Sequence, residues 1–95
     1  MANQSVESEF SRTLLRLRKK VGKSAYQIAQ FSGINEAYLS RLEHGEKTHP
    51  SRNVVLAISM ALVSGNETIS LADIDQLLLS ADLAPLQWRN RLDLS

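Results

Sequence analysis

Apolar residues recur at helical spacing in five segments of this chain, and no segment shows the alternating pattern of a strand. In the first segment, Phe10, Leu14, Leu17 and Val21 follow one another at intervals of four, three and four residues, which places them on one helix face. Gly22 comes next, and glycine often ends a helix because it enters the left-handed conformation without a Cβ clash. We therefore expect a first amphipathic helix that ends at Gly22.

A short second helix is predicted from about Ala25 to Ser32. Ser24 and Gln27 have the spacing of a capping box, and Gly33 follows the last helical position. The residues expected to face inward are Ile28, Ala29 and Phe31.

An equally short third helix is predicted from about Glu36 to His44. Asn35 is a favourable N-cap, and Gly45 marks the end of the helix. Its apolar positions, Leu39 and Leu42, are expected to be buried.

Two longer helices complete the pattern. The fourth begins after Pro50 and Ser51, and the fifth begins at Ser70, where Asp73 completes a capping box. Pro85 is expected to stop the fifth helix. The inward positions are expected to be Val55, Ile58, Ser59 and Leu62 in the fourth helix, and Leu71, Ile74, Leu77, Leu78 and Ala81 in the fifth. The pattern predicts an all-α, compact five-helix fold.

Length and composition agree with one small intracellular domain. The 95 residues suffice for a single modest core, which we expect to span residues 1–83, with a tail over 84–95. The chain has no cysteine, no apolar run of membrane-spanning length and no signal-peptide pattern at its N-terminus. We therefore expect a cytoplasmic location and no membrane partner.

The two halves of the chain differ in charge. Nine basic and five acidic residues give the first 52 positions a net charge of +4, whereas two basic and five acidic residues give the remainder −3. A basic half suggests a polyanionic partner, although a solvated helix face explains the same count.

The second and third helices together have the pattern of a helix-turn-helix. This motif needs a small residue where the helices cross, a glycine in the turn, and apolar residues where the second of the two helices faces the first. The positions that meet these needs are Ala29, Gly33, Leu39 and Leu42.

From about Leu14 to Leu62 the chain resembles the Xre/lambda-repressor-like (Cro-type) family of helix-turn-helix regulators. The segment YLSRLEHG, residues 38–45, and the proline that begins the fourth helix carry much of the likeness. The family usually has glutamine directly after the cap of the second helix, and this chain has Ala25 there instead. The resemblance implies that the third helix enters the DNA major groove with its N-terminal half.

The resemblance places four outward residues of the third helix against the bases: Glu36, Ala37, Ser40 and Arg41. The guanidinium of Arg41 can donate two bonds to guanine O6 and N7, although a solvated arginine is the simpler alternative. Glu36 can accept from a cytosine amine, or it compensates the charge at the helix N-terminus. Ala37 can contact a thymine methyl.

The third helix is nearly neutral, so we expect residues around it to bind the phosphates. Phosphate contacts supply most of the affinity for DNA, while base contacts set the sequence. The expected phosphate contacts are Lys23, Ser24, His44, Lys47 and Arg52. The resemblance also implies an ion pair between Arg18 and Glu43, which would turn the Glu43 carboxylate away from the DNA.

These expectations define a sequence-specific binder of double-stranded DNA that acts as a homodimer on a two-fold symmetric operator, as a repressor rather than an activator. The acidic, leucine-rich end is expected to join the two copies, leaving the basic face free. The expected interface residues are Leu78, Leu83, Leu86, Trp88 and Leu92. In the competing interpretation, Trp88 folds back onto its own domain.

Other function classes are less well supported by the residues. His44 and His49 with Glu43 lack a defensible metal-ligand spacing, and no nucleophile–base pair or phosphate-binding glycine loop is present, so we expect no catalysis, metal or cofactor. An antitoxin-like or other protein-interaction module, whose main partner is another protein, remains the alternative.

Overall fold

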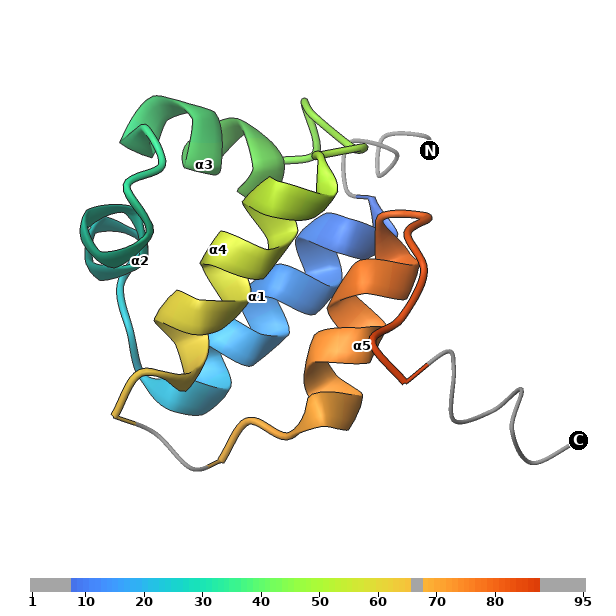
Figure 1. Ribbon diagram of the computed structural model, residues 1–95. Coiled ribbons are helices and arrows are strands. Elements are labelled where there is room, and N and C mark those ends of the chain that lie inside the picture. Colours follow the sequence, from blue (N-terminus) through green and yellow to red (C-terminus); the bar gives the residue numbers. More distant parts are fainter. Residues whose placement is uncertain (1–7, 66–67, 88–95) are drawn as a thin grey trace, which may run out of the picture.

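The computed structural model describes residues 8–65 and 68–87, and within these residues the regular secondary structure consists of helices, without strands. The helices are α1 (Glu9–Val21), α2 (Ala25–Ser32), α3 (Glu36–Glu43), α4 (Arg52–Val63) and α5 (Leu71–Ser80). In Figure 1, α2 and α3 lie on one side of the domain and α5 on the other, with α1 and α4 between them. None of the described helices is both long and apolar enough to cross a membrane.

Helix α1 lies at the centre of the packing, where it contacts α3, α4 and α5. The predicted apolar face of α1 explains this central position, because Phe10, Leu14 and Leu17 on that face are completely buried. The core that they join includes Ile28, Leu39, Leu42, Val55, Ile58, Leu62, Leu77 and Leu78. Burial of a leucine-sized side chain contributes roughly 1.5–3 kcal/mol, so this core supplies the main driving force of folding.

Capping boxes fix the starts of α2 and α5 as the sequence predicts. Ser24 accepts from the Gln27 N–H and Gln27 bonds back to the Ser24 N–H, and Ser70 and Asp73 form the same reciprocal pair. Helix α1 begins with a further capping box at Ser8, which the sequence pattern did not reveal.

Two predicted inward positions are wrong, because Phe31 and Leu71 are exposed. Phe31 is 57% exposed. Its helix has only about two turns, and the direction facing the core is taken by Ile28 and Ala29. At the start of α5, Ile69 is buried in place of Leu71, so the chain enters the core one residue before the N-cap.

The predicted stop of α5 at Pro85 is also wrong, because the helix ends at Ser80. Asp82 adopts a left-handed conformation, with a φ of 63°. The N–H of Asp82 donates to Leu79 O and that of Leu83 donates to Leu78 O, both at 2.9 Å. This is the hydrogen-bond pattern of a Schellman motif with aspartate in the position that glycine usually occupies.

The segment that follows α5, residues 82–86, remains attached to the domain. His49 Nε2 lies 3.0 Å from Asp82 Oδ2, and Arg52 Nη1 donates to Ala84 O at 2.8 Å. The N–H of Leu86 donates to Asp75 Oδ1 at 2.6 Å. These contacts join the C-terminal segment to the α3–α4 loop, to the start of α4 and to α5.

The residues expected to form a dimer interface differ in their surroundings. Leu78 is completely buried in its own domain, so its assignment to an interface is wrong. Leu83 is half-buried against the core, and Leu86 is exposed. Trp88 and Leu92 lie outside the described residues.

Candidate nucleic-acid interface

Helices α2 and α3 form a helix-turn-helix whose turn is fixed by local hydrogen bonds. Gly33 has a φ of 77°, and its N–H donates to Ala29 O at 2.9 Å, which closes α2. Asn35 Oδ1 then accepts from the N–H groups of Ala37 and Tyr38, at 2.8 and 3.3 Å, and starts α3. Ala29, Leu39 and Leu42 are buried in the packing that orients the two helices.

A partly buried ion pair connects α1 to α3. Arg18 Nε lies 2.8 Å from Glu43 Oε2, and the two side chains are 23% and 8% exposed. Arg18 Nη1 also donates to Lys23 O at 3.1 Å. The structure thus contains the ion pair that the family resemblance implies. It holds the Glu43 carboxylate on the inner side of α3 and removes one negative charge from the outer face.

The outer face of α3 presents Glu36, Ala37 and Arg41 to the solvent, with Ser40 half-buried between them. Within residues 8–65 and 68–87, Arg41 forms no ion pair, and its guanidinium makes no hydrogen bond. An extended arginine on the outside of a helix can place both of its terminal N–H groups on one acceptor surface. Arg41 is therefore free to bind an external acceptor.

His44 is already bonded to the end of α3. Its Nδ1 lies 2.7 Å from Ser40 O, and the Ser40 hydroxyl is 3.3 Å from the same nitrogen. Because a carbonyl oxygen only accepts, Nδ1 must carry the hydrogen, and in the neutral ring Nε2 then has none. His44 can therefore donate to a phosphate only as an imidazolium, with both nitrogens protonated.

Lys47 and Ser24 remain available for phosphate contacts. Lys47 is exposed in the α3–α4 loop and forms no ion pair with any described residue. Ser24 is also exposed, and its oxygen accepts from the Gln27 N–H at 3.1 Å, which leaves the hydroxyl hydrogen able to donate.

Lys23 and Arg52, by contrast, are engaged within the protein. Lys23 Nζ donates to Ala61 O and Ser64 O, each at 2.6 Å, at the C-terminal end of α4. An ammonium there satisfies carbonyls that have no helical partner and interacts favourably with the helix dipole. Arg52 Nη1 donates to Ala84 O. Their roles as phosphate contacts would require these bonds to be shared or exchanged.

The sequence pattern assigned no DNA contact to Tyr26, which the structure exposes on α2. In helix-turn-helix proteins the first helix of the motif crosses the DNA backbone, so an exposed hydroxyl on it can donate to a phosphate. The sequence gives only a weak indication of this exposure, because Tyr26 lies just before the buried residues of α2, Ile28 and Ala29, and an aromatic residue there fits a core position equally well.

The fold and this motif define a helix-turn-helix protein. The chain belongs to the helix-turn-helix domain family, whose sequence profile matches residues 9–68. Membership of this family indicates DNA binding and a part in transcription regulation. No curated protein and no solved structure gives a significant match to the chain. Over residues 8–65 and 68–87, no three histidine or acidic side chains are grouped to hold a metal ion.

Proposed function

We propose that the protein is a cytoplasmic repressor of transcription, which binds double-stranded DNA at a specific sequence. The observation that carries this proposal is the uncommitted guanidinium of Arg41 on the outer face of α3. With α3 in the major groove, Arg41 donates to guanine O6 and N7, while Glu36, Ala37 and Ser40 contact neighbouring base edges. The α1–α3 ion pair supports this arrangement because it fixes the direction of α3.

The phosphate contacts in this proposal come from residues around α3. Lys47 and Ser24 donate directly, and His44 does so when it is protonated. Lys23 and Arg52 lie beside the motif but contact phosphate only in exchange for bonds to backbone carbonyls. The number of contacts is measurable, because each neutralised phosphate steepens the dependence of log affinity on log salt by about 0.9.

We further propose that two copies bind together on a two-fold symmetric operator. An α3 of eight residues reads few base pairs, and selectivity in a genome needs more. Two copies related by a two-fold axis read half-sites roughly 34 Å apart. The contact between copies uses the acidic C-terminal third, where Leu79 and Leu86 are exposed and Leu83 is half-buried.

Selection of bound sequences from a random duplex library tests these proposals together. We expect a two-fold symmetric consensus containing guanine in each half, and an affinity for it that falls steeply with salt. A single half-site would contradict the homodimer, and the absence of any enriched sequence would contradict specific recognition. Lys20→Gln serves as a control, because it removes a positive charge that pairs with Asp73 on α5, across the domain from α3 (Figure 1). This variant should select the same consensus as the wild type.

A protein-interaction role is the second candidate. It is favoured by exposed leucines on α5 and by the apolar pocket described below. In that case the protein would show no salt-sensitive affinity for duplex DNA, which distinguishes it from the DNA-binding proposal.

A further inference from the structure

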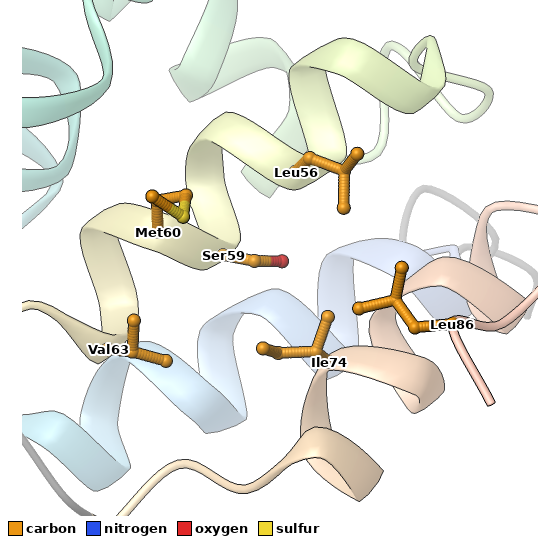
Figure 2. A pocket seen from close by; sticks show the side chains of 6 residues that line it. All are labelled: Leu56, Ser59, Met60, Val63, Ile74 and Leu86. Atoms are coloured by element: carbon orange, nitrogen blue, oxygen red, sulfur yellow. The ribbon is translucent and has the colours of Figure 1, made fainter.

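An open apolar pocket of about 200 Å³ lies between α4 and α5. Figure 2 shows its lining, which consists of Leu56, Ser59, Met60, Val63, Ile74 and Leu86. Among these described residues Ser59 has the only polar side chain, and it gives its hydroxyl hydrogen to Val55 O at 2.8 Å, so it offers little to a polar ligand. Met60 and Leu86 are 61% and 43% exposed, so the apolar lining of the pocket continues onto the surface.

The size of the pocket limits its occupant. Sites for drug-sized ligands have volumes of about 300–1,000 Å³, which exceeds the volume found here. An apolar cavity of about 150 Å³ is known to accept a benzene molecule. The pocket is therefore suited to one large apolar or aromatic side chain.

The chain leaves the described domain at the edge of this pocket. Leu86 lines it, and the Leu86 N–H is fixed by the buried carboxylate of Asp75 at 2.6 Å. One residue earlier, Pro85 is buried, and Arg52 holds Ala84 O. Residues 84–86 are thus fixed beside the pocket, and the segment WRNRLDLS, residues 88–95, follows closely in the sequence.

The sequence of that segment begins with a side chain of the right kind. Trp88 lies two residues after Leu86. Two residues reach at most roughly 7 Å. The α4 stretch from Leu56 to Val63 that lines the pocket is roughly 10 Å long at the helical rise. The pocket is therefore within the reach of the indole, with almost no loop to close.

We propose that the indole of Trp88 docks in the α4–α5 pocket of its own chain and covers Met60 and Val63. The same chain is favoured over a second copy because a short connection gives an effective concentration on the order of millimolar. Loop closure also costs little for so few residues. The docked segment shields the apolar groove together with Leu86, and the contact between copies is left to the other leucines proposed for it, Leu79 and Leu83. The inference does not depend on DNA binding.

The test uses the fluorescence of the full chain, in which Trp88 is the only tryptophan. We expect the blue-shifted emission of a buried indole and weak quenching by acrylamide, both independent of protein concentration. In Met60→Glu, a charge in the pocket should shift the emission to the red and raise the quenching constant severalfold. Because Met60 is exposed, the helical circular dichroism should stay unchanged.

Leu79→Glu is the matched control, since Leu79 is an exposed apolar residue of the neighbouring helix that does not line the pocket. It should leave the emission unaltered even if it disrupts the homodimer. Red-shifted, readily quenched emission in the wild-type chain would overturn the inference, as would an emission insensitive to Met60→Glu. Protection that disappears on dilution would assign the pocket to the tryptophan of a second copy and would equally overturn it.

Discussion

The basic residues before α2 and those around α3 differ in what their side chains do. Four of the six cations of the first group are engaged inside the domain: Arg16 with Gln76, Arg18 with Glu43, Lys20 with Asp73, and Lys23 with the end of α4. In the second group Arg52 is engaged, whereas Arg41 and Lys47 have no ion-pair partner within the described residues. A count of charges along the sequence favours the first group, but most of its donors are already used within the protein.

This difference explains how a helix of little net charge can serve as a DNA reader. The basic half of the sequence mainly connects α1 to the helices around it and to the end of α4. The ability of the α3 face to bind DNA depends on a few side chains whose hydrogen-bond donors are not used within the protein. Substitutions of engaged cations should therefore change stability, and substitutions of uncommitted cations should change binding.

The largest effect is expected from the α1–α3 ion pair. Arg18→Ala leaves the buried Glu43 carboxylate without its partner, and we expect a loss of about 3–5 kcal/mol in the free energy of unfolding. Urea denaturation followed by circular dichroism measures it. The double variant Arg18→Met/Glu43→Leu should recover most of that loss, because no charge is stranded. A loss below 1 kcal/mol in the single variant would contradict a structural role.

Arg41→Ala should affect recognition without affecting the fold. We expect discrimination at one base pair to fall by about 1–3 kcal/mol, with an unchanged unfolding transition. Binding to the selected site and to its single-base variants measures this. Unchanged base preference in Arg41→Ala would refute its role as the base reader.

Lys47→Ala should affect all DNA sequences alike. We expect an equal loss of affinity for every sequence and a decrease of about one in the slope of log affinity against log salt.

Lys23 distinguishes the two groups most directly, because both a structural and a DNA-binding role have been assigned to it. From its bonds to Ala61 O and Ser64 O, we expect Lys23→Met to cost about 1 kcal/mol of stability. The salt slope of DNA binding should remain that of the wild type. A flatter slope with unaltered stability would place Lys23 among the phosphate contacts after all.

His44 should contribute little to binding. Its Nδ1 already donates to Ser40 O, so the neutral ring has no further N–H to offer a phosphate. His44→Gln should therefore lower the affinity for the operator by no more than a few-fold, which titration of a labelled duplex measures. His49→Gln is the control, because His49 faces Asp82 and not α3. A loss of roughly tenfold or more in His44→Gln alone would contradict this minor role.

The smallest effect is expected at Asp73. Burial alone would raise the pKa of its carboxyl, but the hydrogen bond from the Ser70 N–H and the Lys20 ammonium outweigh burial and lower it. The charged form thus contributes stability above the ordinary pKa of 3.8, and this contribution is lost as the pH falls through the lowered pKa of the folded state. Because solvent screens the pair, Asp73→Asn should cost only about 0.5 kcal/mol at pH 7. The difference should vanish in acid; if it persists there, the charge is not its cause.

The fold could be predicted from the sequence wherever periodicity and capping agree. Leu14 and Leu17 define α1 because they repeat at helical spacing, and Ser24 with Gln27 defines the start of α2 because their spacing permits only one reciprocal geometry. The end of α5 could not be predicted, since Asp82 adopts a conformation for which glycine is the usual signal. Phe31 was misplaced because two helical turns define the direction of the core poorly.

The candidate site was predictable in a different way. The outward position of Arg41 follows from the burial of Leu39 and Leu42 on the same helix. The engagement of Lys23 does not follow from the sequence, because its acceptors on α4 are about forty residues away along the chain. A sequence reveals which side chains carry charge, but long-range contacts decide which charges remain available.

The attachment of Arg52 to Ala84 has a consequence for cooperativity. The Arg52 guanidinium holds the segment that leads to the α4–α5 pocket, and Arg52 is also the first residue of α4, next to the α3–α4 loop. A phosphate that takes over this bond would weaken the seating of the C-terminal segment. By thermodynamic reciprocity, anything that strengthens that seating would then weaken DNA binding by the same factor. In this way one arginine can couple DNA binding to the seating of the C-terminal segment without a change of fold.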